Sequence, residues 1–403
     1  MKKYLILLTV IACVLPDIVA GGTSIFGFGP RLIGSYRNSY STSAAGRGGY
    51  EMSFVDSLCI NQMNYALWTR LENTSVSVSF NYNGISTKSN QADIYSTDAN
   101  FMGGFLTLPL KRQKFVIGMG LTPRYINNTG IKVPGFGPDS NVVNKLYSKG
   151  NLSEAVLVGS YAPLPKVSFA LEVGYDFGMI KDELSILYNN SVYSDIYIYD
   201  EYQLRGVNFG LNGFYAISAK IDLGLKYKSS TSITMHQERK SSHLAGSIKQ
   251  SRDINLPALF ALGANYKISP LWQTGIDCIY QNWSESYTVD DSKVGQINDS
   301  YRIGLGFEKS PVEKRFVPFL QNISWRGGFS FSQLNVTVDG NPVYEYGISA
   351  GLSLPIRKHR NRIDIAFEFG QRGDAQSADL KEKFFGISLS LLSSERWFVR
   401  EKR

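Results

Sequence analysis

The stretch RIDIAFEFGQRG, residues 362–373, alternates strictly between two kinds of side chain. Its bulky apolar residues are Ile363, Ile365, Phe367 and Phe369, and the positions between them hold Asp364, Ala366, Glu368 and Gly370. A period of two residues is typical of a β-strand, in which successive side chains point to opposite faces. One face of this strand is therefore apolar and the other carries two carboxylates.

The same alternation recurs along the chain from about residue 74, and no long stretch has the period of a helix. We therefore predict an all-β protein with about 14 strands. The expected strands lie near residues 74–84, 98–110, 113–124, 152–162, 166–177, 203–216, 220–234, 255–267, 270–284, 299–309, 320–332, 343–355, 361–371 and 383–393.

The connections between these strands alternate in length. Most of one set are short, as at 111–113 and 163–165, whereas the other set includes long polar segments, which we expect to be loops, at 125–151, 178–202, 235–254 and 285–298. An even strand number, short turns at one end and long loops at the other are typical of an antiparallel up-and-down barrel in the outer membrane of a Gram-negative bacterium. A closed barrel requires the last strand, 383–393, to pair with the first, 74–84.

Two folds compete for the apolar face. A soluble exported sandwich would bury it and expose the carboxylates to water. Three features favour a transmembrane barrel instead: strands of about 9–11 residues, Tyr and Trp near strand ends, and polar faces that carry both charge signs. The apolar face would then contact lipid. The residues expected to line the lumen include Glu172, Asp176, Asp277, Arg302, Arg326, Glu345, Asp364 and Glu368.

The N-terminus has the features of an export signal. Lys2 and Lys3 precede an apolar run that ends near the small-residue site before Gly21, so residues 1–20 are expected to be a cleaved signal peptide. Val10-Ile11-Ala12-Cys13 leaves open an alternative, a lipoprotein signal with Cys13 as the lipidated residue. The mature chain would keep only Cys59 and Cys278, which do not form a disulfide framework.

Residues 21–73 lack the alternation and are rich in glycine. They are too few for a separate soluble domain, and a barrel of about 14 strands has room inside for a segment of this size. We therefore expect three parts: the signal peptide at 1–20, an N-terminal plug or hatch at 21–73, and the barrel at 74–403.

The stretch AAGRGGYEMSFVDSLCINQMNYALW, residues 44–68, resembles the N-terminal hatch of the FadL-like long-chain fatty acid transporters, the family of TodX. Segments such as SWRGGFSFS and DIAFEFGQRG are similar to the same family and to the PorV-like barrels of Bacteroidetes. The family has Asn-Pro-Ala where this chain has Asn61-Gln62-Met63, so only the asparagine carries over.

This resemblance implies passive uptake of hydrophobic small molecules, such as long-chain fatty acids, through the outer membrane. By analogy the ligand would contact apolar plug residues and leave by a plug rearrangement or a lateral opening in the wall. The candidate plug residues are Phe54, Leu58, Asn61, Met63, Tyr65 and Leu67, with Phe26 and Phe28 upstream. The alternative is an outer-membrane component of protein secretion or anchoring, whose partner would be an exported protein.

Nothing in the sequence points to catalysis or to a cofactor. The three histidines, at 236, 243 and 359, lack metal-ligand spacing, and neither a Gly-x-Ser-x-Gly motif nor a phosphate-binding loop is present. The net charge of +8 includes basic runs in predicted turns, which suit lipid headgroups better than nucleic acid. The expected partners are therefore outer-membrane lipid and a hydrophobic ligand, and no enzyme activity is expected.

Overall fold

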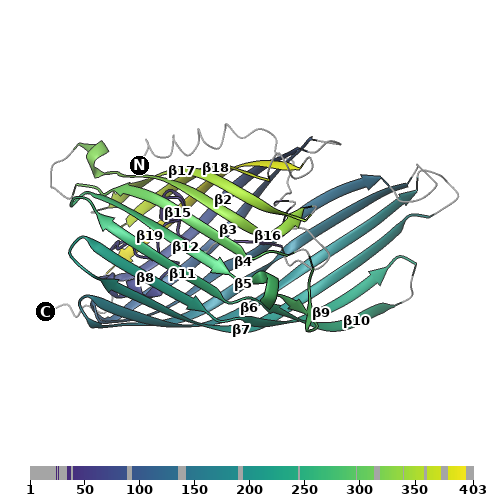
Figure 1. Ribbon diagram of the computed structural model, residues 1–403, viewed down its shortest axis with the longest axis horizontal. Coiled ribbons are helices and arrows are strands. Elements are labelled where there is room, and N and C mark those ends of the chain that lie inside the picture. The colour runs from purple at the N-terminus through teal and green to yellow at the C-terminus, as the bar shows by residue number, and fades with distance from the viewer. Residues whose placement is uncertain are drawn as a thin grey trace.

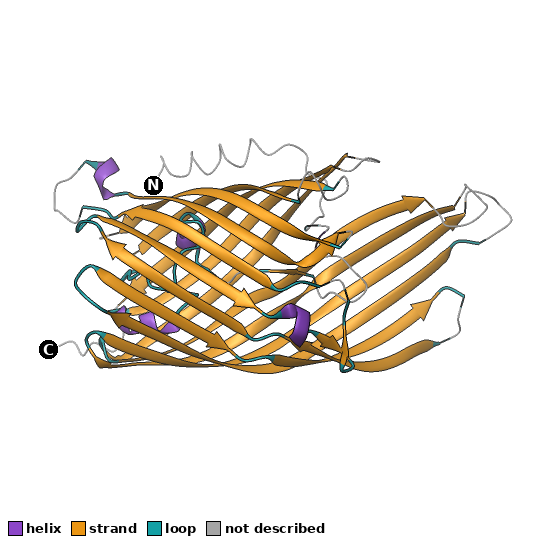
Figure 2. Ribbon diagram, viewed as in Figure 1, coloured by secondary structure: helices purple, strands orange, loops and turns teal. Residues whose placement is uncertain are grey.

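The computed structural model is a closed antiparallel β-barrel whose wall is crossed fourteen times (Figures 1 and 2). The structure describes residues 24, 26, 34–37, 40–88, 93–134, 142–188, 194–243, 246–295, 297–312, 318–338, 340–357, 361–373 and 380–395. The predicted signal peptide, Cys13, Phe28 and His359 lie outside these residues. Each of the fourteen predicted strands coincides with one crossing, so the predicted fold class is confirmed.

Two of the crossings are interrupted and carry two labels each, β8 with β9 and β10 with β11. The wall strands are β2 Thr74–Lys88, β3 Asp93–Lys111, β4 Phe115–Pro134, β5 Val142–Leu164, β6 Val167–Tyr188, β7 Ile196–Ala216, β8 Ile221–Lys228, β9 Thr231–Ser241, β10 Ser247–Leu256, β11 Leu259–Lys267, β12 Trp272–Gln281, β15 Ser300–Lys309, β16 Ser324–Val338, β17 Asn341–Arg357, β18 Asn361–Arg372 and β19 Lys381–Glu395. The short elements are β1 Ser35–Tyr36, α2 Thr42–Ala45, η2 Tyr65–Arg70, α3 Trp283–Ser286, β13 Thr288–Val289, β14 Ser292–Lys293 and η3 Phe319–Asn322.

The barrel closes between its last and first strands, as predicted. The β19–β2 ladder runs from Glu395 opposite Thr74 to Lys381 opposite Lys88. Closure pairs the backbone groups of both strands, which an open sheet would leave facing hydrocarbon at several kcal/mol each. The soluble sandwich is therefore the wrong alternative.

The outer surface of the barrel is apolar and its inner surface is polar. On β18, Phe369 is 52% exposed, whereas Asp364 is 1% exposed and points inward. Leu157, Leu171 and Leu211 are also exposed on the outside of β5, β6 and β7. This arrangement places the chain in the outer membrane of a Gram-negative bacterium, with its apolar rows against lipid. None of the helices in the described residues is long and apolar enough to span a membrane.

Leu171 provides a test of this orientation. A Leu171→Arg change would place a charge in the apolar band of β6 and is expected to lower the free energy of unfolding in lipid by about 2–4 kcal/mol. Lys181→Ala, at an exposed position on the same face above that band, is the matched control and should change it by less than about 1 kcal/mol. Urea unfolding in vesicles measures both, and equal effects would contradict the orientation.

Three of the predicted long loops are largely strand. β4 to β7 have 20, 23, 22 and 21 residues, against 10 for β15 and 12 for β18. Their upper parts, with β9 and β10, project beyond the rest of the rim (Figures 1 and 2). We call this part, residues 127–134, 142–150, 180–188, 196–203, 235–241 and 247–253, the protruding sheet. The prediction of loops was wrong for these three segments. Strands outside the membrane need no apolar outer face, so they lack the alternation of apolar and polar residues by which the other strands were recognised.

Candidate functional site

Residues 40–73, the inner segment, lie inside the barrel and hold α2 and η2. Ser41 caps α2, and its Oγ accepts a hydrogen bond from the N–H of Ala44 at 3.2 Å. The helix leads into the turn at Gly48 and Gly49, whose φ angles are +68° and +80°. A Cβ on Gly48 would lie 2.4 Å from the carbonyl oxygen of Phe329, so the turn can press against the wall only with glycine there.

A continuous chain of buried ion pairs ties the inner segment to the wall. Arg326 Nε lies 2.7 Å from Glu308, and Arg362 Nη1 lies 2.8 Å from Asp56 in the inner segment. Both guanidinium groups also reach Asp364. The order along the chain of charges is Arg47, Glu308, Arg326, Asp364, Arg362 and Asp56. Because charges of both signs alternate, each buried group has a partner.

The Asp56 carboxyl belongs to the inner segment and has a depressed pKa. Burial alone would raise this pKa, but the charge of Arg362 and the N–H of Leu58 outweigh it and hold the pKa at about 2 instead of 3.8. A pKa lowered by folding stabilises the folded state fully above about pH 4. The contribution of Asp56 is therefore lost as the pH falls from about 4 through about 2.

Two further side chains fix the path of the inner segment. Asp277 of β12 accepts the N–H groups of Glu51 and Met52 through one oxygen, at 2.6 and 2.7 Å. Asn61 accepts the N–H groups of Met63 and Asn64 at 3.0 and 2.7 Å, and donates to the carbonyl of Glu51 at 2.8 Å. Asn61 thus shapes its turn without the proline that follows it in the family resembled.

A second group of buried charges lies on the opposite wall. Arg124 Nη1 is 2.6 Å from Asp176, and Lys226 Nζ is 3.0 Å from Glu172. Lys226 also lies over the ring of Tyr65 in η2, at 4.3 Å from its centroid. Of these four residues, Glu172 and Asp176 were predicted to line a wet lumen. They pair with Lys226 and Arg124, and Lys226 contacts the inner segment, so this part of the interior is a packed polar core.

A cavity of about 230 Å³ lies between the inner segment and the upper wall. Its lining mixes charged groups with apolar ones. The charged residues are Arg37, Asp98, Arg302, Glu345, Glu368 and Arg372. The apolar residues include Phe26, Ile85, Met102, Ile126, Ile279, Leu334 and Val336.

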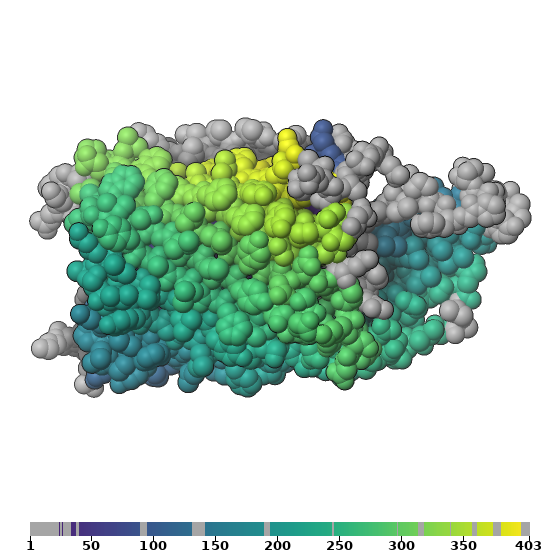
Figure 3. All heavy atoms as spheres, viewed as in Figure 1, coloured from purple at the N-terminus to yellow at the C-terminus, as the bar shows by residue number. Residues whose placement is uncertain are grey.

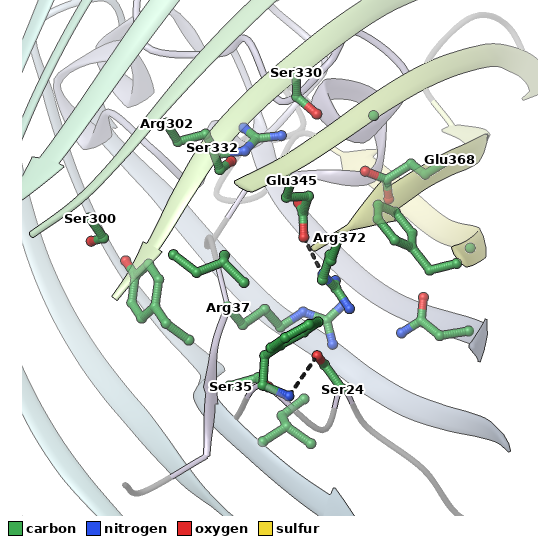
Figure 4. Close-up of a pocket in the computed structure, with 18 of the residues that line it drawn as sticks. Ser24, Ser35, Arg37, Ser300, Arg302, Ser330, Ser332, Glu345, Glu368 and Arg372 are labelled. Carbon is green, nitrogen blue, oxygen red and sulfur yellow. Dashed lines mark hydrogen bonds and ion pairs between the residues drawn. The ribbon is translucent and has the colours of Figure 1, made fainter. Parts of the chain in front are cut away.

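Arg302 is a charged residue of this cavity that has donors available for a ligand. It is 6% exposed, and among the described residues no carboxylate oxygen lies within 4.0 Å of its guanidinium. Its guanidinium donates a hydrogen bond to the Gly48 carbonyl at 3.1 Å and lies 5.0 Å from the centroid of the Tyr40 ring. Arg302 and Arg37 both project into the cavity (Figure 4). Together they could bind an anionic group.

The wall beside the cavity is interrupted between β3 and β4. The two strands pair only over Gly104–Lys111 with Phe115–Leu121. The register shifts between Pro109 and Lys111, next to the turn that joins the strands. Above Leu121, β4 pairs instead with β1 of the N-terminal region, Ser35 opposite Ile126 and Tyr36 opposite Tyr125. β1 therefore stands where the wall would otherwise continue with β3.

An extracellular connection folds over the same region. Trp283 of α3 lines the cavity, and its ring centroid lies 6.2 Å from that of Tyr125 and 5.2 Å from that of Tyr287. Tyr125 in turn lies 5.3 Å from Tyr36 of β1. A continuous aromatic contact thus joins the segment after β12 to the strand that occupies the wall interruption.

Of the sequence-predicted plug residues in the described part of the chain, Phe26 lines the cavity and the other six do not. Phe54, Asn61, Met63, Tyr65 and Leu67 are buried, and Leu58 packs against the hydrophobic cluster that includes Tyr65 and Leu67. A ligand role for them stays a prediction. Of the residues predicted to line the lumen, Arg302, Glu345 and Glu368 line the cavity, whereas Glu172, Asp176, Asp277, Arg326 and Asp364 are in the polar contacts described above.

Sequence reasoning missed the cavity residues of β2 and β3, Asn81, Asn83, Asp98 and Asn100. These polar residues stand at every second position of two neighbouring strands, as residues on one inward face do. This spacing could have identified them from the sequence. Whether these residues lie close to Arg37 depends on the register between the strands. The sequence pattern does not specify that register.

A model of the BamG family matches residues 1–403. The chain belongs to the BamG family. A comparison with curated proteins finds no match. Among the described residues of this BamG-family barrel, no group of three or more His, Cys, Asp or Glu side chains could hold a metal ion.

Several solved barrels share the fold of this BamG-family chain. A Pseudomonas aeruginosa FadL homologue has 12% identity and a TM-score of 0.63, over 90% of this chain and 99% of its own. The Ralstonia pickettii toluene transporter TbuX has 15% identity and a TM-score of 0.60, over 92% and 99%. The P. putida toluene transporter TodX has 13% identity and a TM-score of 0.61, over 90% and 99%. The resemblance to FadL-like barrels is therefore confirmed as a fold, while the likeness to PorV and to Bacteroidetes proteins stays a prediction.

Proposed function

We propose that this protein is a passive outer-membrane channel for hydrophobic small molecules, and that long-chain fatty acids are the ligand class. The observation that carries the proposal is the short β3–β4 ladder beside the cavity. A molecule that entered the cavity could leave sideways into the membrane there, once β1 moved off the edge of β4. Similarity in fold to structures titled as toluene transporters supports this proposal.

The lining of the cavity suits an amphipathic anion. Arg302 and Arg37 could hold a carboxylate, with Tyr40 beside them. Met102 and Ile126, which lie next to the wall interruption, could contact an acyl chain. A hydrocarbon without a charged head would leave the two guanidinium groups without an ionic partner, so we expect a fatty acid to bind more tightly than toluene.

A disulfide across β1 and β4 tests this function. Ser35→Cys with Ile126→Cys places the two cysteines at directly opposed positions. If ligands leave through the wall, the oxidised double variant is expected to take up labelled oleate at least about tenfold more slowly than its reduced form. Cells lacking the native gene and expressing the variant provide the measurement.

The matched control is Leu121→Cys with Ala155→Cys, which joins β4 to β5 at a pair that is already in the closed ladder. Its oxidation should leave uptake unchanged. Uptake that is equally fast in both oxidised proteins would contradict a lateral exit, and a protein that never takes up oleate in any form would contradict the channel itself.

A second candidate is a structural component of protein secretion or anchoring in the same membrane. The buried ion-pair chain favours it, because the pairs Arg47–Glu308 and Asp56–Arg362 hold the inner segment to two wall strands, β15 and β18, and a moving plug would have to break both. This function requires a stable barrel and a protein partner but no transport. Absence of oleate uptake, together with a specific protein partner, would decide for it.

A further inference from the structure

The short turns along one side of the barrel carry cations and no carboxylate. They join β3 to β4, β5 to β6, β7 to β8 and β11 to β12, and these strands follow one another in the wall. The turns are at the end of the barrel opposite the protruding sheet, at the left of Figure 3, and therefore face the periplasm. Their charged residues are Lys111, Arg112, Lys114, Lys166, Lys220 and Lys267.

Five of these cations have no ionic partner in the part of the chain that the structure describes. Lys267 is the exception, because its Nζ lies 2.7 Å from the inward carboxylate of Asp222. We call the other five the basic arc. The exposed carboxylates described at this end of the barrel, Glu72 and Glu395, lie beside β2 and β19, outside the arc. The charge of the arc is therefore available to a partner outside the chain.

Backbone hydrogen bonds between neighbouring hairpins fix the position of the arc. The carbonyl of Lys114 accepts an N–H group from the end of β5, that of Lys166 one from the end of β7, and that of Lys220 one from the end of β11, each at 2.8 Å. Each of these lysines directly precedes the second strand of its hairpin, so they recur every two strands along the rim. This places them about 10 Å apart across the strands, at about 4.8 Å per strand. Each can therefore contact an anion of its own.

The basic arc directly borders the surface of the barrel that contacts lipid. Apolar residues that flank the turns are exposed on the outer wall, as are Leu110, Phe115, Leu164, Ile221 and Trp272. On β15, the strand that follows the arc, Lys309 lies opposite both Trp272 and Trp325, whose rings are exposed. Lysine beside exposed aromatic rings is typical of a membrane interface. The cations of the arc are therefore at the level of the lipid headgroups.

A phospholipid with an anionic headgroup matches both parts of this surface. Its headgroup would contact the cations, and its acyl chains would contact the apolar wall above them. A soluble anion would make only the first of these contacts. The extracellular end of the barrel is different, because cations there pair with carboxylates of the protein, as Lys181 does with Glu201 and Arg239 with Asp200.

We propose that the basic arc binds the headgroups of anionic phospholipids in the periplasmic leaflet of the outer membrane. Lys114, Lys166 and Lys220 each contact the phosphate of one lipid, and Arg112 can donate two parallel hydrogen bonds to such a group. The surface lies outside the barrel, away from the cavity, and it does not depend on the uptake proposed above.

Quenching of tryptophan fluorescence by brominated lipids tests this proposal. Tyr215 is 48% exposed at the end of β7, between the turns that hold Lys166 and Lys220, so Tyr215→Trp places a reporter beside the arc. In vesicles that contain phosphatidylglycerol and phosphatidylcholine, brominated phosphatidylglycerol is expected to quench this added fluorescence with an apparent affinity at least about threefold higher than brominated phosphatidylcholine. Tyr175→Trp, on the outer wall of β6 nearer the extracellular side, should show no such preference. Both leaflets of the vesicles have the same composition, so the direction of insertion does not affect the result.

Two double variants assign the preference to the arc. Lys166→Gln with Lys220→Gln should abolish the preference measured at Tyr215→Trp. Lys181→Gln with Lys240→Gln, which removes two exposed cations from the protruding sheet, is the matched control and should leave the preference unchanged. Heat-dependent mobility on a denaturing gel shows whether each variant is folded.

Several outcomes in folded protein would overturn the proposal. They are equal quenching by the two lipids at Tyr215→Trp, the same preference at Tyr175→Trp, or a preference that survives Lys166→Gln with Lys220→Gln. Inorganic phosphate distinguishes a lipid headgroup from a free anion. Replacing chloride by phosphate at constant ionic strength should leave the preference unchanged, and its loss in phosphate would assign the arc to soluble anions instead.

Discussion

Arg326→Met is expected to lower the free energy of unfolding by about 3–5 kcal/mol, the largest single stability effect in this barrel. The guanidinium of Arg326 is fully buried and lies 2.7 Å from Glu308 and 3.5 Å from Asp364. Its removal leaves two buried carboxylates with one cation fewer between them, and the cost of their desolvation is no longer offset. Unfolding in urea, followed by tryptophan fluorescence in lipid vesicles, measures the change.

Arg239→Met is the matched control for this prediction. Arg239 also pairs with an aspartate at 2.7 Å, but its side chain is 47% exposed on the protruding sheet. Solvent screens such a pair, so its loss should cost less than about 1 kcal/mol. Adding Asp364→Asn to Arg326→Met should restore part of the stability, because it removes one of the uncompensated charges. Equal costs for the two arginine variants would show that burial does not make the Arg326 ion pairs more important for the stability of the barrel than the exposed pair of Arg239.

Asp277→Ala is expected to make the thiol of Cys59 react with a water-soluble maleimide at least about tenfold faster. The Asp277 carboxylate is the acceptor for the N–H groups of Glu51 and Met52, and loss of two buried hydrogen bonds favours opening of the inner segment. Cys59 reports this opening because it is buried in that segment, and burial raises the pKa of its thiol to about 12. A thiol with such a pKa is almost wholly protonated at pH 8 and reacts slowly.

The measurement is the labelling rate of the Cys59 peptide by mass spectrometry at pH 8, in a protein in which the exposed Cys278 is replaced by serine. The control is Glu201→Ala, which removes a carboxylate from an exposed ion pair on the outer face of β7. It should leave the rate unchanged. Unaltered labelling in folded Asp277→Ala would mean that the contacts of Asp277 do not hold the inner segment in place.

The candidate site was only partly predictable. Alternation identified Arg302, Glu345 and Glu368 as inward residues, because side-chain direction follows from position along a strand. It could not distinguish the cavity from the packed interior, since Asp364 and Glu368 belong to one face of one strand. Asp364 is paired with Arg326, whereas Glu368 lines the cavity beside Tyr40. That difference arises from where the inner segment passes.

The sequence by itself determined the strands, their number, the lipid-facing rows and the closing pair, because each follows from a period of two residues and from the cost of unpaired backbone groups in lipid. Only the tertiary structure decided which inward charges are locked in pairs, where the cavity lies and that β1 replaces β3 beside β4. These depend on contacts between residues far apart in the chain, as Arg362 with Asp56, and local alternation carries no information about them. The protruding sheet is another feature that only the tertiary structure decided. Above the membrane no lipid requires an apolar outer face, so the sequence there lacks the alternation that reveals a strand.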